Sequence, residues 1–125
     1  MGYAWSVGAI EIRRVYDAEG AEGAVFLVDR IWPRGVRRSD LALDGWVRDV
    51  APSTELRQWF GHRPERFAEF RERYRRELDG RPEAVRPLLD AARAGPVTLL
   101  YAARDTEHNQ AVVLREYLRD RLAGE

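Results

Sequence analysis

The sequence predicts an α/β fold in a single domain, with a small, mainly parallel, Rossmann-like sheet flanked by helices. Residues 24–28 (AVFLV) and 97–102 (VTLLYA) are continuous apolar runs rich in β-favouring residues, a pattern typical of strands buried on both faces. The chain between them carries helical patterns, and intervening helices make the crossovers of parallel sheets. Because 125 residues suit one domain, we expect a three-layer arrangement with helices on the faces of one sheet.

Other segments complete the sheet and its loops. Residues 10–15 alternate apolar and polar side chains, which predicts a first strand. Residues 17–23 contain two glycines and two glutamates, which predict a turn or short loop. A loop punctuated by proline and glycine follows at 31–38. Residues 46–51 fit either a short third strand or a helical turn, and the sequence leaves both open.

Helices are predicted in the middle and at the end of the chain. Capping residues, prolines and apolar stripes at helical spacing delimit them. In the second of them, for example, Phe67, Phe70 and Tyr74 fall on one face. The expected helices open near Ser53 and close at Gly61, run from Pro64 to Leu78, follow Pro82 and end at Gly95, and cover about residues 109–122.

The composition narrows the classes of protein. Hydrophobic residues make up 45% of the chain, so it can fill a core, and disorder is a poor interpretation despite 34% charged residues. Acidic and basic groups balance at 21 each, which argues against a strongly basic nucleic-acid coat protein. All the basic residues are arginine, so any anion must be held by guanidinium groups or backbone amides. The absence of cysteine excludes disulfides, thiolate metal sites and cysteine nucleophiles.

Localisation and assembly are inferred from the apolar runs and the N-terminus. No apolar run has the length of a bilayer span and no signal-peptide pattern is present, so we expect a cytoplasmic protein with no membrane partner. Residues 1–9 have no clear period and are interpreted as a loosely ordered arm before a domain at 10–125. Tyr3 and Trp5 on this arm offer a patch for self-association, so that a monomer and a homodimer are both open.

Polar residues follow both buried strands. In open α/β sheets, ligands gather beyond the carboxyl ends of the strands, where the loops of parallel neighbours meet. Arginines there suit a phosphate or carboxylate, as do the free amides at the start of the last helix. Asp29 and His108 are the candidate catalytic proton carriers. The candidate ligand-binding residues are Arg30, Trp32, Arg34, Arg104, Asp105 and Asn109.

Each candidate also has a structural interpretation. The Asp-Arg pair at 29–30 and the Arg-Asp pair at 104–105 can neutralise each other in a charge network. Asp105 can instead cap the last helix, and His108 fits a capping or surface histidine. Trp32 fits a packing anchor of its loop as well as a stacking surface for a planar ligand.

Nucleophilic and metal chemistry are less well supported. Ser53 and His62 could be considered as a nucleophile and its base, but no G-x-S-x-G elbow surrounds the serine. Ser53 is therefore better explained as a helix cap, and His62 as a residue of the loop between helices. The sequence has no metal-binding motif, and two histidines without cysteine predict no metal site.

The motifs around the two strand ends and the predicted helices, taken in order along the chain, resemble those of the YeaO-like branch of DUF488, a bacterial family of domains of unknown function. The resemblance covers about residues 10–122, and it implies a compact Rossmann-like α/β domain without implying a settled activity. Other branches carry a Cys-x-Glu…Cys-His-Arg pattern after the last strand, where this chain has no cysteine. Only the position of a site is therefore implied. The matching residues are 28–35 (VDRIWPRG), Leu43-Asp44, Trp46, 51–53 (APS), 59–62 (WFGH), 100–105 (LYAARD), His108-Asn109 and 111–114 (AVVL).

Three functions remain open. The favoured one is a domain that binds or acts on a small phosphate- or carboxylate-bearing ligand in the cleft at the strand ends. The second is a nucleic-acid-associated protein that uses the arginine-rich loop 30–38, for which weak, sequence-independent binding is expected at most. The third is a non-catalytic interaction module. The sequence identifies neither the ligand nor a cofactor.

Overall fold

The computed structural model of the protein describes residues 9–125 and contains a sheet of four parallel strands. They are β1 (Ile10–Arg14), β2 (Ala24–Leu27), β3 (Gly45–Trp46) and β4 (Val97–Tyr101). The order across the sheet is β1-β4-β2-β3, so β2 and β4 are adjacent and parallel, with Phe26 opposite Leu99. This confirms the α/β class and the parallel pairing of the two apolar runs.

The helices are α1 (Thr54–Phe60), α2 (Phe67–Asp79), α3 (Pro82–Ala94) and α4 (Gln110–Ala123). Their bounds agree with those expected from the sequence to within about two residues, the usual uncertainty of helix ends, except at the start of α2. This helix was expected from Pro64, but Pro64–Arg66 form a 3₁₀ turn and α2 begins at Phe67. The stretch that fitted either a strand or a helical turn contains both, because the short strand β3 is followed by a 3₁₀ turn at Arg48–Val50.

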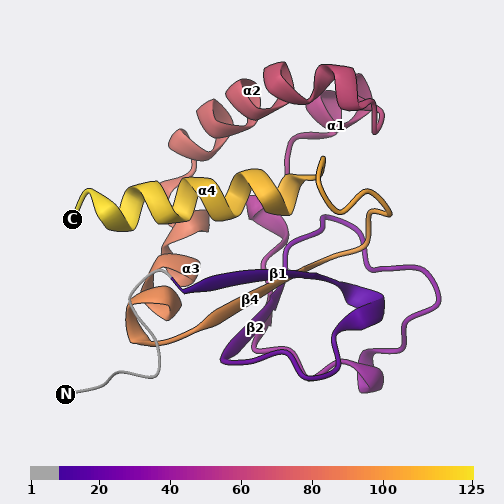
Figure 1. Cartoon of the computed structure of the whole chain (residues 1–125), viewed down its shortest axis with the longest axis vertical. Helices are drawn as coiled ribbons and strands as arrows, with labels where there is room; N and C mark the ends of the chain where they lie inside the picture. Colours follow the sequence, from indigo (N-terminus) through magenta and orange to yellow (C-terminus); the bar gives the residue numbers. More distant parts are fainter. Residues whose placement is uncertain (1–8) are drawn as a thin grey trace.

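All of these helices lie on the same side of the sheet (Figure 1). Successive side chains of a strand point to opposite faces. Phe26 and Leu99 point to the face whose core includes buried side chains from α1, α2, α3 and α4. Figure 1 shows α4 between the sheet and α2. α3 and α4 contact the strands, α2 packs on α4, and all four helices contribute to one continuous apolar core.

The other face of the sheet is covered by loops. Leu27 and Leu100 point into a smaller core with side chains from the connections after β1 and β2, among them Val15, Trp32 and Leu41. The structure thus differs from the three-layer arrangement expected. The link from β1 to β2 spans residues 15–23, which is shorter than the roughly dozen residues that a helical crossover needs.

The start of the β2–β4 pair depends on Gly23. The N–H of Ala24 donates to the carbonyl of Pro96 at 3.0 Å. Gly23 has a φ of +71°, and a Cβ at this position would lie 2.0 Å from the Pro96 oxygen. Only glycine combines this backbone conformation with so close an approach.

Two further expectations concern the N-terminal arm and membrane spans. The proposed arm at residues 1–9, with Tyr3 and Trp5, lies outside the described residues apart from Ala9. Within residues 9–125, none of the helices combines the length and the apolar character that a membrane span requires.

Candidate functional site

A pocket of about 730 Å³ opens beyond the carboxyl ends of β2 and β4. The sequence predicts ligand binding at this edge of the sheet, because the loops of adjacent parallel strands meet there. Five parts of the chain form its wall, namely Tyr16 after β1, residues 29–34 after β2, residues 51–62 around α1 (Ala51, Pro52, Arg57 and His62), residues 102–105 after β4, and Gln110 at the start of α4.

Asp29 is the central carboxylate of this pocket. Its Oδ2 accepts from the backbone N–H of Ala102 at 3.0 Å, and its Oδ1 accepts from Nε2 of Gln110 at 2.6 Å. The Asp29 carbonyl accepts from the indole N–H of Trp46 at 2.7 Å. Burial raises the pKa of Asp29 to about 6, because the loss of water outweighs these hydrogen bonds and the positive charge of Arg57. A carboxyl group with such a pKa changes charge close to neutral pH.

The pocket is rich in guanidinium groups. Arg34, Arg57 and Arg104 line it with exposed side chains, and among residues 9–125 their guanidinium groups have no hydrogen-bond or ion-pair partner. Arg30 is half-buried and donates from Nη2 to the carbonyl of Pro52 at 3.3 Å. Its Nε is buried without a hydrogen-bond partner in the described part of the chain. The charge network suggested for the Asp-Arg pairs at 29–30 and 104–105 is not formed there.

Asp105 and His108 are paired with each other. Oδ1 of Asp105 accepts from the backbone N–H groups of Glu107 and His108, both at 2.9 Å, and Oδ2 lies 2.9 Å from Nδ1 of His108. The two backbone hydrogen bonds hold the pKa of Asp105 below its usual range. The imidazole also meets the ring of Phe67 edge-on, with centroids 5.3 Å apart. His108 is not among the pocket-lining residues, so the geometry does not bring it together with Asp29.

Asn109 and Trp32 have well-defined structural contacts. Asn109 is buried and caps α4, because its Oδ1 accepts from the N–H of Val112 at 3.1 Å and its Nδ2 donates to the Asp105 carbonyl at 2.8 Å. Trp32 lines the pocket, but its indole N–H donates to the carbonyl of Val36 at 2.7 Å. Of the residues predicted from the sequence, the pocket therefore contains Asp29, Arg30, Trp32, Arg34, Arg104 and Asp105, and it leaves out His108 and Asn109.

The pocket also contains residues that sequence reasoning did not assign to it. Arg57 lies on the exposed side of α1, and Gln110 is the first residue of α4. His62 follows Gly61, and both have a left-handed backbone, with φ of 58° and 54°. A histidine with positive φ is uncommon, and such conformations are concentrated at functional sites. The sequence signal that could have assigned His62 to the site is the motif at residues 59–62 (WFGH), which is among the residues that resemble the family.

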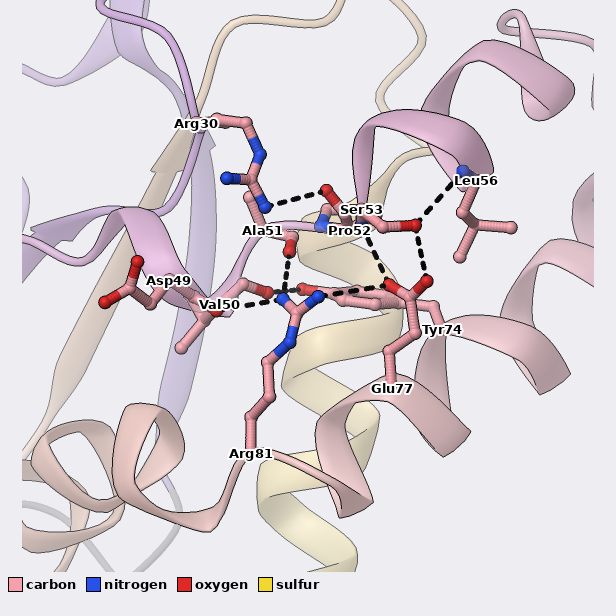
Figure 2. Close-up of polar contacts among 10 residues, drawn as sticks. All are labelled: Arg30, Asp49, Val50, Ala51, Pro52, Ser53, Leu56, Tyr74, Glu77 and Arg81. Carbon is pink, nitrogen blue, oxygen red and sulfur yellow. Dashed lines mark hydrogen bonds and ion pairs between the residues drawn. The ribbon is translucent and has the colours of Figure 1, made fainter.

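The wall formed by residues 51 and 52 is anchored to α2 and α3. Figure 2 shows Nη1 of Arg81 donating to the carbonyls of Asp49 and Ala51 at 3.1 and 2.9 Å. Glu77 accepts from the backbone N–H of Ser53 at 2.8 Å and from its hydroxyl, and the hydroxyl of Tyr74 donates to the carbonyl of Val50. These contacts fix a segment that has no strand ladder of its own.

Ser53 has the capping role that the sequence suggested. Its Oγ accepts from the N–H of Leu56 at 3.1 Å while its own hydroxyl hydrogen is donated to Glu77. Its hydrogen bonds thus run to α1 and α2 rather than to His62. Within residues 9–125, no group of three or more histidine, aspartate or glutamate side chains is arranged to hold a metal ion.

Comparison with known proteins places the chain in a family. Residues 9–125 match the family described as "Inactive DUF488-N3 subclade". Escherichia coli K12 has a similar protein, Uncharacterized protein YeaO, which is 47% identical over 111 residues that cover 88% of this chain and 96% of that protein. The Mycobacterium tuberculosis H37Rv protein Uncharacterized protein Rv3073c is 42% identical over 113 residues, which cover 90% and 95% of the two chains. No solved structure matches significantly. The chain is thus a YeaO-like member of the DUF488 family.

Proposed function

We propose that this protein binds a small phosphate- or carboxylate-bearing ligand in the pocket at the ends of β2 and β4, as a binding protein rather than an enzyme. The observation that carries the proposal is the presence in one pocket of three guanidinium groups, those of Arg34, Arg57 and Arg104, that have no partner within residues 9–125. Guanidinium groups bind phosphate and carboxylate through paired hydrogen bonds.

The balance of charge in the pocket supports an anion. Arg30 adds a fourth guanidinium group, against two carboxylates, Asp29 and Asp105. Asp105 already accepts hydrogen bonds from two backbone N–H groups and lies beside His108, and both oxygens of Asp29 accept a hydrogen bond from the protein. The arginines are therefore the groups whose hydrogen bonds a ligand can complete.

Binding without turnover agrees with the description of the family as inactive. The arrangement of the two expected proton carriers also favours it, because His108 interacts with Asp105 and Phe67 instead of lining the pocket with Asp29. General acid–base catalysis requires the acid or base to be within hydrogen-bond reach of the reacting group.

Contacts of the arginine-rich loop favour a small ligand over nucleic acid. Arg38 packs over the rings of Trp32 and Trp46, at 4.7 and 5.3 Å from their centroids, and Arg30 bonds to the chain at Pro52. Within residues 9–125, Arg34 and Arg37 are then the residues of this loop whose guanidinium groups have no hydrogen-bond, ion-pair or cation–π partner. A phosphate-backbone site would be expected to present more cations along one surface.

The proposal is tested by titrating the protein with sulfate, phosphate and succinate at constant ionic strength. Binding is measured by isothermal titration calorimetry and by changes in the amide chemical shifts of the protein. We expect the Arg34→Ala, Arg57→Ala and Arg104→Ala variants to remain folded and each to weaken binding by roughly 10-fold or more, the usual effect of losing a hydrogen bond to a charged group. The ligand should be recovered unchanged after incubation.

Arg86→Ala and Arg76→Ala are the matched controls. Both side chains are exposed and lie outside the pocket, and their loss removes the same charge from the protein. If these two changes weaken binding as much as the pocket variants do, the anion responds to net charge alone and the proposed site is wrong. Shifts of amide signals should also be confined to the segments that line the pocket, residues 29–34, 51–62 and 102–105, and to their neighbours.

A further inference from the structure

We propose that the ligand of this pocket joins its anionic group to a planar aromatic ring, and that the ring stacks on Tyr16 beside Ile31. The inference rests on the proposed anion-binding function and names the class of anion. Tyr16 and Ile31 are the large hydrophobic side chains that the described residues leave exposed, at 49% and 61%, and both line this pocket. Exposed apolar groups that gather at one concave site are typical of ligand contact.

The ring of Tyr16 is held in place before any ligand arrives. Its hydroxyl donates to the carbonyl of Arg34 at 3.0 Å, and the guanidinium group of Arg14 lies 5.0 Å from its centroid. Arg14 is itself fixed, since it donates to the carbonyls of Ala103 and Ala102 at 3.0 and 3.4 Å. An aromatic surface that is already ordered loses little conformational entropy when a second ring stacks on it.

The same contacts place the aromatic surface next to the cationic one. Tyr16 is bonded to the backbone of Arg34 and, through Arg14, to the two residues that precede Arg104. Tyr16, Arg34 and Arg104 also line the same pocket, so a ligand whose anion binds the two arginines can reach the Tyr16 ring. The volume of about 730 Å³ is also that of pockets for organic ligands, far more than a bare phosphate needs.

Adenosine 5′-monophosphate, ribose 5-phosphate and octyl phosphate are suitable probes, because they share the phosphate and differ in what it carries. We expect the parent protein to bind the adenosine compound roughly 5- to 150-fold more tightly than ribose 5-phosphate, the range that base–aromatic stacking gives. Tyr16→Leu should remove this preference, which is measured as the ratio of the two affinities within each variant, because the loss of the hydrogen bond to Arg34 affects both phosphates alike. Tyr16→Phe should retain most of the preference because it keeps the ring.

The outcomes separate this inference from the function on which it rests. Equal affinities for adenosine 5′-monophosphate and ribose 5-phosphate in the parent would overturn the aromatic inference and leave the anion site standing. A preference that survives in Tyr16→Leu, or octyl phosphate binding as tightly as the adenosine compound, would overturn it too. If none of the three phosphates binds, and sulfate does not bind either, the anion-binding function itself is wrong.

Discussion

The carboxylate of Asp29 and the side-chain amide of Gln110 are joined by a hydrogen bond of 2.6 Å between residues that are 81 positions apart in the sequence. The bond ties the end of β2 to the first residue of α4. Because the other oxygen of the same carboxylate accepts from the N–H of Ala102 after β4, three elements meet on one ionisable group. The charge of Asp29 is therefore coupled both to the stability of the fold and to the pocket.

Replacing Asp29 by asparagine should change how stability depends on pH. Burial raises the pKa of Asp29 from 3.8 to about 6, so the folded protein binds more protons than the unfolded chain between these values. The free energy of unfolding of the parent should then fall as the pH rises through this window. Relative to the parent, Asp29→Asn should gain about 1–3 kcal/mol between pH 4 and pH 7.5, measured by urea denaturation. A constant difference across this range would contradict the raised pKa.

Sulfate should bind more tightly as the pH falls through about 6, because protonation of Asp29 removes a negative charge from the pocket. Sulfate is the right probe, since its charge stays constant over this range whereas phosphate titrates. His62 is a second ionisable side chain that lines the pocket. Titrations of Asp29→Asn and His62→Gln separate the two groups. If Asp29→Asn keeps the full pH dependence, Asp29 is not its source.

Gly23→Ala should destabilise the protein more than Gly35→Ala. Both glycines have a positive φ, of +71° and +77°, which costs about 1–2 kcal/mol for alanine. Only at Gly23 would the new Cβ meet another group, the Pro96 oxygen at 2.0 Å, whereas nothing lies within 4 Å at Gly35. We expect a loss of about 2–4 kcal/mol for Gly23→Ala in thermal or urea unfolding. Equal losses would show that the β2–β4 pair can shift to relieve the collision.

Asn109→Ala should weaken the fold without weakening anion binding. The side chain caps α4 through the N–H of Val112 and is buried outside the pocket lining, so its removal should cost about 1–2 kcal/mol of unfolding free energy. Sulfate affinity, measured where the variant is fully folded, should equal that of the parent. A variant that folds normally but has lost sulfate affinity would instead place Asn109 in the site.

The parts of the fold that the sequence predicted are those with a local signal. The apolar run that became β2 and the helix cap Ser53 act within a few residues of themselves. The cap of α4 is Asn109, whereas the sequence offered Asp105 and His108 for that role. β3 has two residues, too few for any periodicity to appear. The apolar run at 97–102 predicted that both faces of β4 are buried. The same run does not indicate that helices cover one face and loops the other.

The residues of the candidate site that lie close to strand ends were predictable from the sequence, and the others were not. Asp29 and Arg104 come shortly after the ends of β2 and β4, so the pairing of these strands was enough to bring them to one edge. Tyr16 and Arg57 reach the pocket only through the path of their own segments around the sheet edge, which leaves no mark in local sequence. The raised pKa of Asp29 likewise depends on burial by residues distant in the chain.

The strand order has a consequence for how the protein is made. β1 and β2 each pair with β4, which occupies an interior position of the sheet although it is the last of the described strands to leave the ribosome. Until residues 97–101 emerge, the nascent chain can form the two-residue ladder between β2 and β3 but neither of the longer ones. The apolar side chains of β2 therefore lack their partner strand β4 until that segment has been made, and transiently exposed apolar surface of this kind favours aggregation. The β1–β4 and β2–β4 pairs of this domain should consequently form only after residues 97–101 have been synthesised.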